Sequence, residues 1–121
     1  MTTMYSTTVR EIGPEAATFA AEGMAVLFGP EAPGELRDFC YIIDRTDLTG
    51  TLAPGATLHL GDAAFAVTAV GAAAQKNLVD LGHVTLHFSG ATEAELAGTI
   101  YLEAAGQIPP ISVGTTIALT A

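Results

Sequence analysis

The stretch from residue 65 to residue 88 constrains the fold most, because it predicts three successive elements with different periodicities. Residues 65–71 are apolar and rich in β-branched side chains, which indicates a mostly buried strand. Residues 72–81 combine an alanine-rich start with leucines at helical spacing, so they predict a short helix, and Gly82 suits its left-handed C-terminal residue. Residues 83–88 alternate polar and apolar side chains, as in a strand with one buried face.

The rest of the chain predicts short strands separated by glycine and proline turns. Gly61-Asp62 is typical of a two-residue hairpin turn, and Pro54-Gly55 of a type II turn. The other expected strands are residues 5–10, 24–28, 39–44, 57–60, 99–102 and 115–119, with helical segments at 14–22 and 36–38. The hairpin turn at Gly61-Asp62 extends the strand at 65–71 toward its start, so that residues 63–70 form the second strand of the hairpin. We therefore expect a mainly β fold, in which residues 1–121 form a small single-domain β-barrel or β-sandwich with two or three short helices.

The charge balance excludes one class of function. Thirteen acidic and four basic residues give a net charge of −9, and phosphate backbones repel such a surface, so we expect no nucleic-acid partner. A basic protein partner would be attracted. No apolar run reaches the length of a membrane span, and the first residues lack the pattern of a secretion signal. The single cysteine permits no internal disulfide, so a cytoplasmic location is expected.

The histidines are the first candidates for chemistry, because a neutral imidazole is a competent nucleophile. His83 and His87 are four positions apart, and on a strand their rings would lie about 13 Å apart, too far for one metal ion. We expect His59 to lie on a solvated outer face, and Cys40 to be a buried, inert thiol. Common catalytic and cofactor-binding motifs are absent from the sequence, so neither a metal nor a cofactor is expected.

A series of spaced residues in order supports a family resemblance between about Tyr5 and Thr99. The most specific part is Val67-Thr68-Ala69-Val70-Gly71, followed by Leu81-Gly82-His83-Val84-Thr85-Leu86. Further matches are Pro33, Leu36, Phe39-Cys40, Ile42, Leu48, Gly50, Pro54-Gly55, Leu60-Gly61, Asn77-Leu78, Phe88, Gly90 and Gly98-Thr99. On these residues the chain resembles the glucitol/sorbitol-specific IIA component of the bacterial phosphoenolpyruvate-dependent sugar phosphotransferase system.

The resemblance implies a cytoplasmic, mostly β phosphocarrier without a cofactor. Such a protein takes a phosphoryl group from the histidine phosphocarrier HPr onto a histidine of its own, and passes it to a membrane-bound IIB/IIC sugar permease. The implied acceptor histidine falls at position 43, and a second histidine falls two residues later. This chain has Ile43 and Arg45 at those positions.

Three hypotheses follow from the replaced histidine. In the first, His83, which matches a family histidine, accepts the phosphoryl group, and Arg45 holds the phosphate oxygens. The alternative is that His83 is a supporting or core histidine hydrogen-bonded to backbone. In the second, the domain is degenerate and serves as a regulatory or assembly module. In the third, it binds a small ligand on the same fold. A homodimer through edge strands is compatible with each hypothesis.

Overall fold

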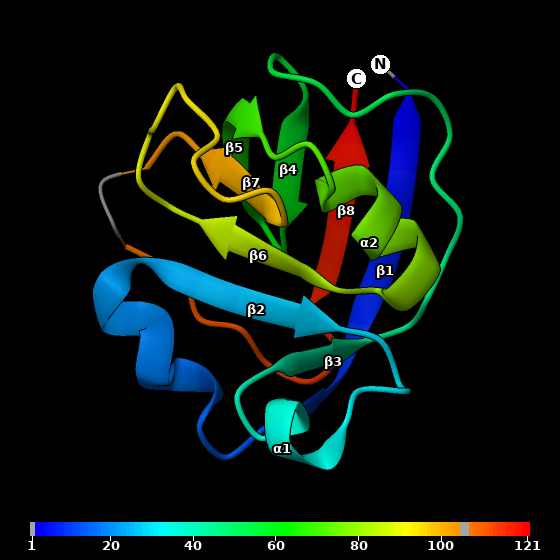
Figure 1. Ribbon diagram of the computed structural model, residues 1–121, viewed down its shortest axis with the longest axis vertical. Helices are drawn as coiled ribbons and strands as arrows, with labels where there is room; N and C mark the ends of the chain where they lie inside the picture. Colours follow the sequence, from blue (N-terminus) through cyan, green and yellow to red (C-terminus); the bar gives the residue numbers. More distant parts are fainter. Residues whose placement is uncertain (1, 105–106) are drawn as a thin grey trace.

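The computed structural model describes residues 2–104 and 107–121, and they form a closed β-barrel (Figure 1). Around the barrel the strand order is β1-β3-β2-β6-β7-β5-β4-β8. The elements in chain order are β1 (Thr3–Ile12), the 3₁₀ helix η1 (Ala16–Glu22), β2 (Met24–Phe28), α1 (Gly34–Arg37), β3 (Tyr41–Ile43), β4 (Thr57–Leu60), β5 (Ala63–Val70), α2 (Ala74–Leu81), β6 (Val84–His87), β7 (Thr99–Leu102) and β8 (Thr116–Thr120).

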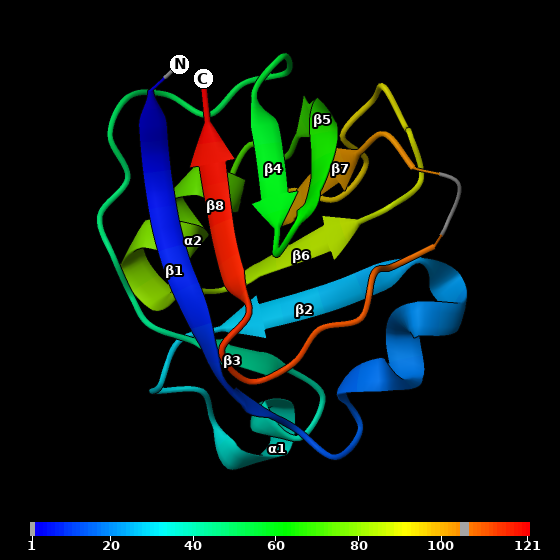
Figure 2. The same ribbon diagram turned by 180° about the vertical axis from the view of Figure 1, so that it is seen from behind.

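Two parallel strand pairs interrupt an otherwise antiparallel barrel. β2 pairs with β3 and β6 pairs with β7 in parallel, whereas the other neighbours are antiparallel. The first and last strands are hydrogen-bonded neighbours, so both chain ends lie at the same end of the barrel (Figure 2). The sequence was compatible with a barrel or a sandwich, and the structure has the closed barrel, in which each of the eight described strands has a neighbour on both sides.

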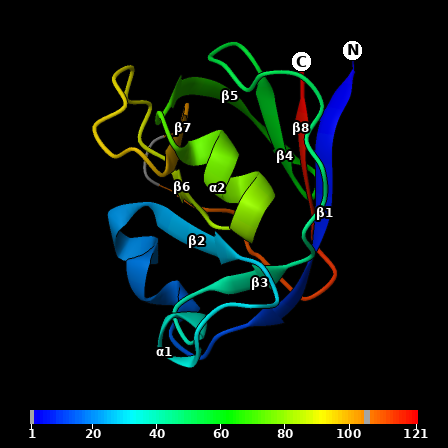
Figure 3. The same cartoon turned by 45° about the vertical axis from the view of Figure 1, so that its right-hand side comes forward.

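The main hydrophobic core fills the inside of the barrel. Side chains alternate along β6, so that it directs Val84 and Leu86 inward and leaves the outer face to polar residues, as the sequence predicts. α2 adds Ala74 and Leu78 to this core, on the side of the barrel that Figure 3 presents. Gly82 ends α2 with a φ of 71°, which confirms the expected left-handed residue.

A second, smaller core lies outside the barrel, on the outer face of β2 and β3. It consists of Phe28, Ala32, Cys40 and Ile42, with Val26 packed against it. η1 and α1 flank this face; in Figure 1 they are the blue helix before β2 and the cyan helix below β3. β3 is therefore buried on both faces, and all three of its residues are apolar.

The expected strand boundaries are confirmed for residues 24–28, 57–60, 63–70 and 99–102. The bounds of β1, β6, β8 and the three helices differ from the expected ones by one or two residues at an end, and two further predictions need correction. Residues 39–44 form a strand only from Tyr41 to Ile43, because the amides of Phe39 and Cys40 bond back to Leu36 and Arg37 and prolong the α1 turn. The strand at 65–71 is less completely buried than expected, because a bulge lies between Val67 and Ala69. Val67 belongs to the main core and Phe65 and Val70 pack against it, whereas Ala66 is exposed on the barrel exterior.

A close contact between two glycines joins the end of α2 to the end of β2. Gly29 donates its amide hydrogen to Leu81 O over 3.0 Å. A Cβ at Gly82 would lie 2.8 Å from the Gly29 nitrogen, and one at Gly29 would lie 2.5 Å from Leu81 O. Both backbones therefore need glycine to approach this closely.

We predict that Gly82→Ala lowers the free energy of unfolding by about 1–3 kcal/mol, because it adds left-handed strain and a backbone clash. Gly34→Ala is the matched control, since a Cβ at Gly34 meets nothing within 4 Å. Urea unfolding of both variants measures the difference. Equal stabilities would show that the Gly29–Gly82 contact does not constrain the fold.

Candidate functional site

Position 43, where the resemblance implies an acceptor histidine, lies inside the barrel. Ile43 is the last residue of β3, opposite Val9 of β1, and its exposed fraction is 0%. Along β3, Tyr41 and Ile43 belong to the inner core, whereas Ile42 belongs to the outer one. The side chain at position 43 is thus an aliphatic core residue without a nucleophilic atom.

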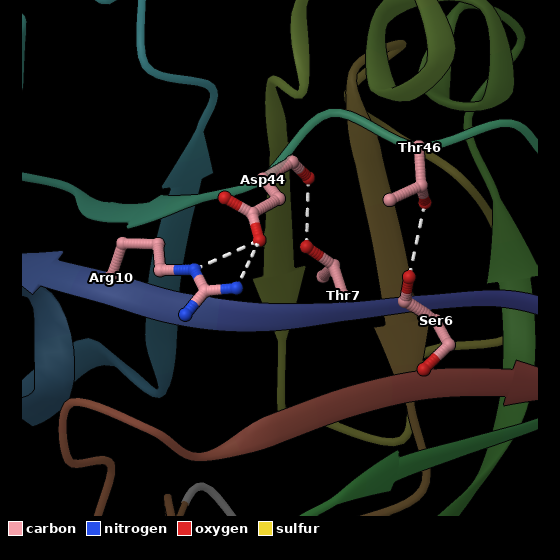
Figure 4. Close-up of polar contacts among 5 residues, drawn as sticks. All are labelled: Ser6, Thr7, Arg10, Asp44 and Thr46. Carbon is pink, nitrogen blue, oxygen red and sulfur yellow. Dashed lines mark hydrogen bonds and ion pairs between the residues drawn. The ribbon is translucent and has the colours of Figure 1, made fainter.

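The segment after position 43 is fastened to β1 by polar contacts (Figure 4). Thr7 donates its hydroxyl to Asp44 O over 2.7 Å, and Thr46 donates to Ser6 O over 3.1 Å. Arg10 donates from Nε to Asp44 Oδ2 over 2.8 Å, and this bond lowers the pKa of the Asp44 carboxyl. The path of the chain through Arg45 is therefore fixed on both sides.

The guanidinium of Arg45 is held by a carboxylate. Arg45 Nη1 lies 2.9 Å from Glu31 Oε1, and the side chain is 42% exposed. Its stem packs where Gly29 and Gly82 meet, since a Cβ at either glycine would lie 2.9 or 3.3 Å from Arg45 Cγ. Arg45 also lines a hollow of about 360 Å³ together with Asp47. A phosphate would have to displace Glu31 from this guanidinium, and it would meet the Asp47 carboxylate in the same hollow.

His83 lies directly before β6, on the outside of the barrel. Its ring stacks on Phe28 with centroids 4.3 Å apart, and its Nδ1 lies 3.3 Å from Leu27 O. A carbonyl oxygen only accepts hydrogen bonds, so this contact favours the tautomer with the proton on Nδ1. Nε2 then carries the lone pair, and among the described residues it has no hydrogen-bond partner.

A groove of about 310 Å³ opens beside His83 on the outer face of β2 and β6. Its lining also includes Phe19, Val26, Leu36, Phe39, Cys40 and Thr85. In the part of the chain that the structure describes, no lysine or arginine lines this groove. Burial raises the pKa of the Cys40 thiol, which keeps it protonated and unreactive, as expected from the sequence. A phosphoryl group on His83 that entered this groove would therefore meet mostly apolar walls.

Among the described residues, no hydrogen bond joins His83 to Arg45, the two site candidates of the sequence. The Arg45 guanidinium bonds to Glu31 and His83 bonds to Leu27 O, and they line separate hollows. The groove was not predicted from the sequence. Two apolar residues close to a proline–glycine turn, Leu36 and Phe39, are the pattern that indicates it.

The other two histidines occupy separate positions on the outer face. His59 Nε2 lies 3.0 Å from Thr120 Oγ1, and the His87 ring centroid lies 5.4 Å from that of Tyr101. Residues 2–104 and 107–121 contain no group of three or more histidine, cysteine or acidic side chains able to hold a metal ion. Over the same ranges, the helices are all too short or too polar to cross a membrane.

Comparisons with known proteins give a consistent result. Residues 4–118 match the sequence profile of the PTS system glucitol/sorbitol-specific IIA component. The glucitol/sorbitol-specific EIIA components of Shigella flexneri and Escherichia coli (strain K12) are each 42% identical over 109 residues, which cover 90% of this chain and 87% of theirs. The crystal structure of a PTS system IIA component from Enterococcus faecalis V583 superposes with a TM-score of 0.83 at 34% identity, covering 97% of this chain and 100% of that one.

We predict that ¹⁵N NMR of the imidazole nitrogens finds the neutral His83 ring protonated at Nδ1, because Leu27 O only accepts. His59 is the control, since its neighbour Thr120 has a hydroxyl that either donates or accepts and so imposes no tautomer. A proton on Nε2 of neutral His83 would contradict the assignment of the Leu27 hydrogen bond.

Proposed function

We infer the function from the family, because this chain belongs to the glucitol/sorbitol-specific IIA components of the PTS system. We propose that it acts there as a partner-binding module that carries no phosphoryl group at position 43. In this role it meets HPr and a IIB/IIC permease in the cytoplasm and regulates or assembles them, without relaying the phosphoryl group itself.

One observation carries this proposal: Ile43 is fully buried in the barrel core. Phosphoryl transfer to a protein needs a nitrogen, oxygen or sulfur nucleophile in line with the donor. An isoleucine side chain has none, and its position in the core leaves a donor no approach. Arg45, at the second implied histidine, carries a guanidinium paired with Glu31, and a guanidinium does not replace an imidazole nucleophile.

A second candidate function is favoured by the orientation of His83. With its proton on Nδ1 held by Leu27 O, the ring directs reactivity to Nε2. In that reaction the P–N bond of phosphorylated HPr breaks as a P–Nε2 bond forms. Arg45 would have to leave Glu31 to hold the phosphoryl oxygens, since the described lining of the groove supplies no cation. Because this role requires the Arg45–Glu31 ion pair to break, it is the second candidate.

The proposal is tested by intact-mass analysis after incubation with phosphoenolpyruvate, Enzyme I and HPr. We expect HPr to gain one phosphoryl group and this chain to gain none, because position 43 has no acceptor atom. The His83→Gln variant is measured in parallel, as glutamine keeps a polar side chain without an imidazole.

A phosphoryl group on the wild-type chain that is absent from His83→Gln would overturn the proposal in favour of the second function. The phosphoryl group could instead persist in the His83→Gln variant. The variants His59→Gln and His87→Gln would then identify the acceptor, and the proposal would be overturned in the same way. Phosphorylated HPr in the same tube is the internal control that the upstream reaction works.

A further inference from the structure

We propose that the groove between η1 and α1 is the docking face for a basic protein partner, which inserts an apolar side chain beside His83. The proposal rests on the proposed function, since partner binding is the activity that function leaves to the chain. It adds a surface and the chemistry of the partner that fits it.

The shape of the groove suits an inserted side chain. Val26 of β2 and Thr85 of β6 are paired neighbours that line the groove together with His83, which directly precedes β6. Phe19 of η1 and Phe39 beside α1 also line it, and their ring centroids are 5.9 Å apart. Leu36 is 50% exposed and Phe39 is 38% exposed, so the described chain leaves these walls uncovered. Exposed apolar side chains that gather around a groove are typical of interaction sites.

The charges beside the groove select the partner. Glu15 and Glu22 flank η1, and Glu35 and Asp38 belong to α1 or follow it directly. These four carboxylates are exposed and form no ion pair with any residue that the structure describes.

Arg37, the basic residue of α1, is already neutralised. Arg37 donates to Glu11 Oε2 over 2.8 Å and to Pro30 O over 2.8 Å. Within the described residues, each of the four basic side chains of the protein pairs with its own carboxylate, so none remains to balance the groove. The surface therefore complements a partner that carries lysine or arginine around an apolar centre.

The same charges argue against a second copy of this chain in the groove. Two copies would each carry a net charge of −9 and would bring exposed carboxylates together. His83 supports a basic partner further, because its Nε2 lone pair accepts a hydrogen bond and Phe28 and Leu27 O hold the ring in place.

The test measures calorimetric affinity for unphosphorylated HPr as the probe, with Leu36→Ser and Leu96→Ser as matched variants. Both leucines are exposed, at 50% and 56%, but Leu96 lies next to Tyr101 and Gly71, away from η1 and α1. We expect Leu36→Ser to weaken binding about tenfold or more, as truncation of an interface anchor does, and Leu96→Ser to leave it unchanged. The double variant Glu35→Gln, Asp38→Asn should bind with a weaker dependence on salt.

Four other outcomes would each contradict the proposed docking face. If wild type binds HPr and Leu36→Ser binds equally well, the partner uses another surface while the proposed function stands. If wild type binds no HPr, the proposed function fails together with its docking face. If sedimentation finds a wild-type dimer that Leu36→Ser dissociates, a second copy occupies the groove. If a small molecule from the expression host co-purifies and is lost in Leu36→Ser, the groove is a ligand site.

Discussion

The closure of the barrel is the constraint on which the rest of the structure depends, because it gives every strand one inner and one outer face. Hydrogen bonds between β1 and β8 complete the ring. Strict alternation along β3 then puts Ile43 inside and Ile42 outside, under α1. A residue at position 43 is consequently part of the core, and an isoleucine there serves packing and no transfer chemistry.

The same alternation leaves the outer face of β2 and β6 to His83 and the groove. There the chain combines a fixed imidazole, uncovered apolar walls and carboxylates without counter-ions. Phosphoryl oxygens need cations, and the described lining of the groove includes no lysine or arginine. A basic protein surface needs carboxylates, and Glu35 and Asp38 beside the groove are exposed. Electrostatics therefore separates the proposed binding role from the phosphocarrier role that the family name suggests.

Local features of the fold could be predicted from the sequence, and long-range ones could not. The Gly61-Asp62 hairpin and the left-handed Gly82 follow from conformational preferences of the residues concerned. The inward orientation of the Ile43 side chain could not be predicted, because the three-residue strand of Tyr, Ile and Ile has no charged or strongly polar residue to mark its outer side. Nor could the partners of His83 and Arg45 be predicted: Leu27 lies 56 positions from His83, and Glu31 reaches Arg45 only once β2 and β3 have paired.

An NMR titration of the ¹⁵N-labelled chain with unphosphorylated HPr tests the central claim most directly, since it reports binding and its location without any transfer step. The account predicts amide shift changes on η1, on α1 and at the start of β6, with the β4–β5 turn at Gly61 unchanged as the internal reference. An unchanged spectrum at excess HPr, or changes confined to the β4–β5 side, would contradict it.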